Sequence, residues 1–132
     1  MLWVVDSEKR LPPGIIVSAS SLGGTLVQDD GPGGLAYLLV DRVIQWAARQ
    51  HTRSAELPDV FWCLMGRLAA HEVGHALLRS AAHSRRGLMR PAFSARDLWL
   101  SPAVDNGAYG LSVEERAAVS RQLAAPAGWP AA

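Results

Sequence analysis

The segment His71-Glu72-Val73-Gly74-His75 places two histidines on either side of a glutamate at a spacing that suits metal chemistry. Residues at positions i and i+4 lie on one face of an α-helix, so both imidazole rings can reach the same ion. Ring nitrogens bind zinc at about 2.0–2.1 Å. We therefore expect His71 and His75 to be two ligands of a site that holds one Zn²⁺ per chain.

Glu72 is the expected general base of this site. It lies about 100° round the helix from His71, where its carboxylate faces the water of such a site rather than the metal. Zinc lowers the pKa of that water toward ~7, so a neighbouring carboxylate can accept its proton during attack on a carbonyl. The same carboxylate can then protonate the leaving amine. This chemistry is that of a zinc-dependent metalloendopeptidase, whose partner is a peptide or protein substrate.

A catalytic zinc site usually has three protein ligands and one open position. His83 follows His75 by eight residues, which allows the helix to end and the chain to turn back toward the metal. We therefore expect His83 to be the third ligand. The competing candidates for this position are carboxylates: Asp97, Glu114 and Glu115.

The stretch HEVGHALLRSAAHS, followed by GLM, resembles the metzincin metallopeptidases, especially their matrixin-like group, over residues 68–91. The resemblance implies a zincin-like minimal catalytic domain, a zinc cofactor and peptide-bond hydrolysis. It also implies these roles: His71, His75 and His83 as metal ligands, Glu72 as the base, and Met89 as the methionine of a tight turn beneath the metal, the Met-turn.

Two features depart from the usual metzincin pattern. The third histidine comes two residues later, and Leu78 stands where the helix-ending glycine would be, so either the helix runs further or the connecting turn is wider. Leu35–Val40 matches the family's edge strand, which receives an extended substrate. Residues 6–14 are too few for the family's long first helix, so we expect a minimal domain or one that lacks its N-terminal part.

The elements that must position these residues follow from apolar patterns. Short β-branched runs predict strands at Leu2–Val5 and Ile15–Val17, and the continuous apolar run Leu35–Val40 predicts a strand covered on both faces. Residues 23–34 are rich in glycine and aspartate, which is typical of turns and an exposed loop.

Three helices are expected. Asp41 can cap a helix over residues 42–50. A long helix over residues 58–80 carries His71 and His75 and is apolar almost all round, which predicts burial. Ser112 and Glu115 form a capping box before a final helix at 113–124. We predict an α/β (α+β) fold, with a small mixed β-sheet packed on the long active-site helix, in one domain at 1–125 with a flexible tail at 126–132.

Composition excludes several classes of partner. The 132 residues include 13 Lys plus Arg against 12 Asp plus Glu, a net charge of +1, so no electrostatic footprint for nucleic acid is visible. No apolar run approaches the roughly 18 to 20 residues of a membrane span. We expect no nucleic-acid partner and no membrane partner. The N-terminal residues lack a secretory signal pattern, and the single cysteine, Cys63, excludes an internal disulfide.

Two alternative functions remain open from the sequence. The first is a gluzincin-type peptidase, in which Glu114 or Glu115 on the later helix is the third ligand. The second is a non-catalytic, zinc-stabilised interaction domain with a closed or incomplete cleft.

Overall fold

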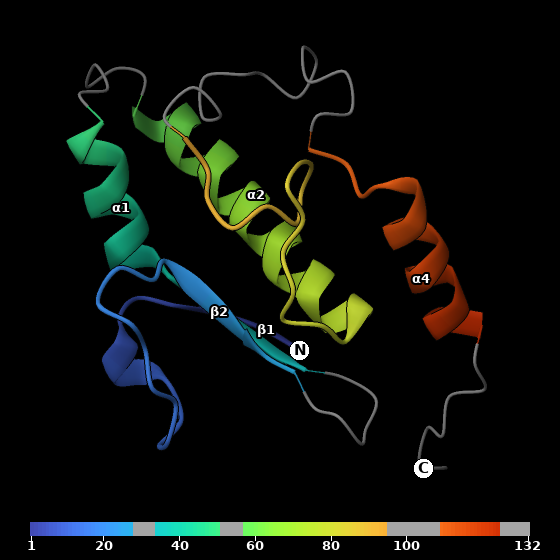
Figure 1. Cartoon of the computed structure of the whole chain (residues 1–132). Coiled ribbons are helices and arrows are strands. Elements are labelled where there is room, and N and C mark those ends of the chain that lie inside the picture. Colours follow the sequence, from blue (N-terminus) through green and yellow to red (C-terminus); the bar gives the residue numbers. More distant parts are fainter. Residues whose placement is uncertain (28–33, 51–56, 95–108, 125–132) are drawn as a thin grey trace.

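The computed structural model describes residues 1–27, 34–50, 57–94 and 109–124. Asp97 and the tail at 126–132, both named in the predictions, lie outside these ranges. The elements, in chain order, are β1 (Leu2–Val5), the 3₁₀ helix η1 (Glu8–Arg10), β2 (Gly23–Leu26), β3 (Leu35–Leu39), α1 (Val40–Arg49), α2 (Leu57–Leu78) and α4 (Val113–Ala124) (Figure 1).

The three strands form one mixed sheet in the order β1-β3-β2. β1 runs parallel to β3, with Leu2 opposite Ala36 and Val5 opposite Leu39. β2 runs antiparallel to β3, with Gly23 opposite Leu38. A mixed sheet packed against helices confirms the predicted fold class. The expectation that Leu35–Val40 is an edge strand is wrong, because β3 is the central strand and its buried, continuous apolar run is covered by neighbours on both sides.

The segment expected to be a loop supplies the edge strand. β2 comprises Gly23–Leu26, inside the stretch predicted as a turn-rich loop. An added Cβ at Gly23 would lie 2.6 Å from the carbonyl oxygen of Tyr37, and one at Gly24 would lie 2.6 Å from the Tyr37 hydroxyl. The glycines therefore allow a close approach between strands rather than a turn. The strand expected at Ile15–Val17 is not formed, and Ile16 is 94% exposed, so it has no sheet to pack on.

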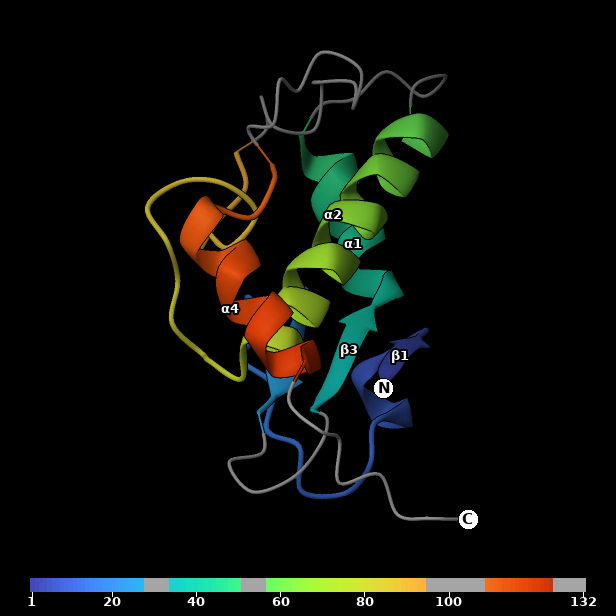
Figure 2. The same cartoon turned by 90° about the vertical axis from the view of Figure 1, so that its right-hand side faces the viewer.

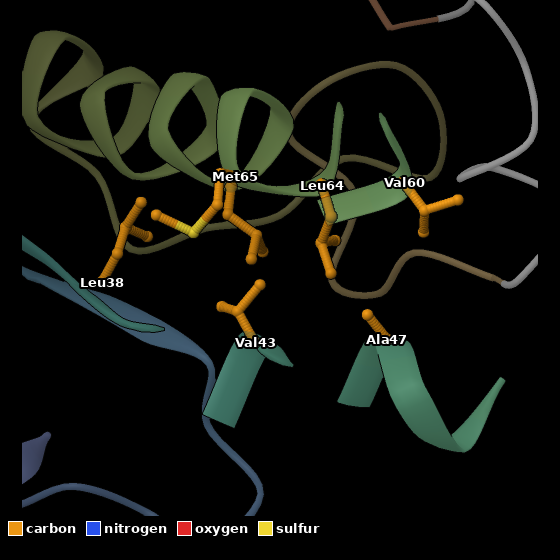
Figure 3. Close-up of a cluster of buried hydrophobic side chains, with 7 residues drawn as sticks. Leu38, Val43, Ala47, Val60, Leu64 and Met65 are labelled. Atoms are coloured by element: carbon orange, nitrogen blue, oxygen red, sulfur yellow. The ribbon is translucent and has the colours of Figure 1, made fainter. Parts of the chain in front are cut away.

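The hydrophobic core lies where α2 meets the sheet and α1. Val43 and Ala47, one turn apart on α1, are fully buried beneath α2 (Figure 3). Leu38 on β3 reaches the same cluster. The cluster consists of Leu38, Val43, Ala47, Val60, Leu64, Met65 and Leu68. Figure 2 places α2 between the sheet on one side and α4 on the other, which makes α2 the element on which the others pack.

The structure corrects the predicted start of α1 and the predicted burial of α2, and it bears out the predicted cap of α4. α1 begins at Val40, so Asp41 lies in the first turn instead of capping it, and its Oδ1 accepts the Arg42 N–H at 2.8 Å. α2 is not buried all round, since Trp62 is 67% exposed on the face turned from the sheet and α1. The capping box of α4 is confirmed, because the Glu115 N–H donates to Ser112 Oγ at 3.1 Å and the Ser112 N–H donates to Glu115 Oε2 at 2.7 Å.

The C-terminal end of α2 decides where the chain turns back toward the histidines. The helix ends at Leu78, two residues earlier than predicted, and Arg79 adopts a left-handed conformation with φ 49°. This is the conformation in which helices commonly terminate, usually at a glycine. The Ser80 N–H then donates to the His75 carbonyl at 3.2 Å. In the described parts of the chain, no helix is both long enough and apolar enough to cross a membrane.

Candidate metal centre

The three predicted histidine ligands come together in the structure. His71 and His75 lie one turn apart on α2 and are only 6% and 5% exposed. His83 reaches them from the loop that follows the helix. The Nε2 atom of His75 lies 3.0 Å from that of His71 and 3.2 Å from that of His83. Within the described part of the chain, the ligand atoms of these three histidines all lie within 4.8 Å of one another, so together they could hold a metal ion.

Backbone carbonyls orient the two helix histidines. His71 Nδ1 lies 2.8 Å from the Leu88 carbonyl oxygen, and His75 Nδ1 lies 2.7 Å from the Ser80 carbonyl oxygen. A carbonyl oxygen can only accept, so each Nδ1 carries a hydrogen, and in the neutral imidazole each Nε2 then keeps a lone pair. The inward-facing atoms are therefore acceptors, and two lone pairs 3.0 Å apart repel each other unless a cation or a proton lies between them.

The geometry suits a metal cation. Nitrogen ligands about 2.0–2.1 Å from a tetrahedral ion are separated by about 3.3 Å, close to the two distances from His75 Nε2 to the other imidazoles. Burial, then the neighbouring His75 and His71, lower the pKa of His83, although Glu72 opposes this shift. The neutral form of His83, which is the form that binds metals, is therefore favoured over the protonated one.

Met89 lies against the segment of α2 that carries both histidines. Its side chain is fully buried. An added Cβ at Gly74 would lie 2.5 Å from the Met89 sulfur, so the sulfur occupies the space that a side chain at position 74 would need. The methionine predicted for the Met-turn is thus packed against the helix between His71 and His75. Its neighbour Leu88 provides the carbonyl that orients His71.

Glu72 is buried at 7% exposure, and β2 provides its partner. The Thr25 hydroxyl lies 2.7 Å from Glu72 Oε2 and 2.8 Å from the Glu72 carbonyl oxygen. A hydroxyl has one hydrogen, so it donates to one of these oxygens at a time. Thr25 is not among the residues predicted from the sequence, because it lies in the segment expected to be a loop and no local pattern links it to a residue 47 positions later.

Two of the carboxylates considered as alternative third ligands, Glu114 and Glu115, lie in the described part of the chain and outside the histidine group. Glu115 Oε1 accepts a hydrogen bond from the Ser84 hydroxyl, and its other oxygen caps α4. Neither Glu115 nor Glu114 belongs to the group of ligand atoms found in the described residues. Glu115 therefore contacts Ser84, the residue next to His83, and does not replace His83 in the ligand group.

A cavity of about 530 Å³ opens beside the histidines. The three histidines and Glu72 line one part of it, and the β2 residues Gly23, Gly24 and Thr25 line another. Ser18, Ser20 and Ser21 also line it, together with apolar side chains that include Leu22, Val27, Trp46, Leu64, Leu68 and Phe93. The site therefore combines a group of metal-ligand atoms, a carboxylate and a hollow of mixed polarity whose size is usual for ligand sites.

Comparison with known proteins found no match to this chain among family models, curated proteins or solved structures. The likeness to metzincins therefore rests on the residues of this chain alone. What those residues define is a small α+β domain with a three-histidine group that can bind a metal ion.

Proposed function

We propose that this protein is a zinc-dependent metalloendopeptidase. The observation that carries the proposal is the convergence of three imidazole Nε2 atoms, two of which keep a lone pair because backbone carbonyls accept from their Nδ1–H groups. Glu72 follows the first ligand and its carboxylate lines the same cavity. A three-histidine donor set with an open fourth position is an arrangement of catalytic zinc sites.

Each residue of the site has a defined task in this proposal. His71, His75 and His83 would hold the ion, which when bound supplies Lewis-acid polarisation and makes a nearby water more acidic. Glu72 takes a proton from the attacking water and delivers it to the leaving amine nitrogen. Thr25 directs the Glu72 carboxylate through its hydrogen bond to Oε2.

An extended peptide is the substrate that fits the sheet. β2 lies at one edge of the sheet and its residues line the cavity beside the histidines. A peptide strand added to β2 would form main-chain hydrogen bonds and place a carbonyl near the ligand group, with affinity that does not depend on side-chain sequence. β2 would thus take the substrate-binding role that was expected of Leu35–Val40.

Metal content and cleavage on the same samples test the proposal. Elemental mass spectrometry of the purified wild-type chain should find one zinc per chain, and a quenched peptide library should be cleaved until a chelator is added. His71→Ala and His83→Ala should each lose or sharply weaken both zinc binding and cleavage. Zinc retained in His83→Ala would assign the third ligand to a carboxylate.

The same experiment separates the catalytic proposal from a metal-stabilised interaction domain. Stoichiometric zinc and loss of the fold on chelation, with no cleavage of any library peptide, would favour the interaction domain. A wild-type chain that binds no zinc would contradict both. The cavity beside Glu72 favours the enzyme, because a purely structural zinc site is closed by a fourth protein ligand.

A further inference from the structure

The first turn of α4 and the segment just before it are each joined by a hydrogen bond to the loop that carries His83. The Ser84 hydroxyl donates to Glu115 Oε1, and the Leu88 N–H donates to the Gly110 carbonyl at 3.1 Å. Ser84 adjoins His83 in the chain, and the Leu88 carbonyl orients His71. Both bonds therefore act on residues that hold the metal-ligand group, although α4 provides none of its ligands.

Glu115 uses both of its carboxylate oxygens in these contacts. Oε1 accepts from Ser84, and Oε2 accepts the Ser112 N–H at 2.7 Å. Burial raises the pKa of Glu115, but the hydrogen bonds from Ser84 and Ser112 outweigh it, so that the pKa is lowered overall. The group is a charged carboxylate at neutral pH, and hydrogen bonds to a charged acceptor are the stronger kind.

The loop needs such restraint because of its own structure. Residues 80–83 form no helix or strand, and His83 is the exposed member of the three histidines. The carbonyls of Ser80 and Leu88 attach the two ends of the loop to α2, and the Ser84 N–H donates to the Met89 carbonyl at 2.8 Å, which closes the loop on itself between those ends. A ligand on an unrestrained loop must be ordered when the ion binds, and that ordering weakens binding.

We propose that Glu115 is a positioning residue for the third metal ligand, and that through Ser84 it makes the C-terminal helix a determinant of metal affinity. This inference rests on the proposed metal site and deepens it. Glu115 acts on the ion through Ser84 and the backbone of His83, not as a ligand. Partners that orient metal ligands typically change affinity by about 10- to 100-fold when removed, and Glu115 stands one step further out. We expect a loss of about 10-fold.

Zn²⁺ titrations of the full chain against a chromophoric chelator test this. Glu115→Ala and Ser84→Ala should each weaken Zn²⁺ affinity about 10-fold, and the double variant should be no weaker than either single one. Ser84→Thr, which keeps the hydroxyl, should restore the affinity. The visible spectrum of bound Co²⁺ should change in both alanine variants, because the position of His83 relative to the other ligands changes.

Two control variants separate positioning from stability and from charge. Ser112→Ala removes the other half of the capping box and should lower the melting temperature while leaving Zn²⁺ affinity unchanged. Glu114→Ala removes the same charge from the neighbouring exposed position and should also leave affinity unchanged. Circular dichroism establishes that each variant is folded before the titration.

The outcomes distinguish the inference from the proposed function. Wild-type affinity in Glu115→Ala, or losses that add up in the double variant, would overturn the positioning role and leave the metal site intact. An equal loss of affinity in Ser112→Ala would also overturn it, because helix stability alone would then explain the effect. A wild-type chain that binds neither Zn²⁺ nor Co²⁺ would overturn the metal site itself.

Discussion

The groups that hold His71 and His75 in place are main-chain carbonyls, those of Leu88 and Ser80. A carbonyl cannot be changed by substitution, so the orientation of these ligands depends on the backbone path of the loop after α2. That path includes the left-handed residue Arg79 and the buried Met89. At the scale of single residues, the positions of His71 and His75 are therefore set by their spacing on α2, but the orientation of their rings depends on the backbone of the loop.

Thr25 provides a test of how Glu72 is directed. Thr25→Val keeps the shape of the side chain but removes the hydroxyl that lies 2.7 Å from Glu72 Oε2. We expect kcat for peptide cleavage to fall by about 10-fold, with KM and zinc content little changed, because the carboxylate loses its orienting partner.

Thr25→Ser, which keeps the hydroxyl, is the matched control and should retain most of the wild-type rate. Steady-state kinetics and elemental analysis on the same preparations check both variants. Equal rates in Thr25→Val and the wild type would show that Glu72 does not need this hydrogen bond.

At the scale of elements, the packing of α2 on Met89 can be tested with two glycines of the same helix. An added Cβ at Gly74 would meet the Met89 sulfur at 2.5 Å, whereas one at Gly66 meets nothing within 4 Å. Gly74→Ala should lower the free energy of unfolding by about 1–3 kcal/mol, because the buried sulfur must move.

Gly66→Ala should instead raise the free energy of unfolding by about 0.5–1 kcal/mol, because alanine loses less conformational entropy in a helix. Chemical denaturation of the metal-free chains measures both changes. Stabilisation of similar size by both alanines would mean that Met89 does not pack against Gly74 in solution.

The predicted helices and the strands β1 and β3 formed where local apolar patterns placed them, whereas β2 and the strand expected at Ile15–Val17 were predicted wrongly. The α2 histidines and the capping box of α4 depend on residues three or four positions apart, and both were located from the sequence. β2 was missed because its glycines favour turns locally and are needed only for the close approach to Tyr37 on β3. The central position of β3 depends on β1 and β2, which pair with it from either side.

At the scale of the whole molecule, the candidate metal-ligand group draws on segments that are far apart in the chain. α2 and the His83 loop provide the ligands, while β2 and α4 hold Glu72 and Ser84 in place. An ion bound to the folded state alone adds stability according to its concentration and affinity.

Adding zinc to the metal-free chain at about 100 times its dissociation constant should raise the free energy of unfolding by roughly 2.7 kcal/mol. Chelation should reverse this gain. The melting temperature of His71→Ala should not respond to zinc, because a ligand is missing. Calorimetry with and without zinc measures the shift, and an equal shift in His71→Ala would mean that zinc binds elsewhere on the chain.

The sequence by itself determined the types and helical spacing of His71, Glu72 and His75, the candidacy of His83, and the fold class, because these follow from short-range periodicity and capping. Only the tertiary structure decided that His83 meets the other two histidines, that Thr25 hydrogen-bonds Glu72, and that Ser84 hydrogen-bonds Glu115. Those contacts join residues that are up to 47 positions apart, and long-range pairing depends on how the sheet, α2 and α4 pack together.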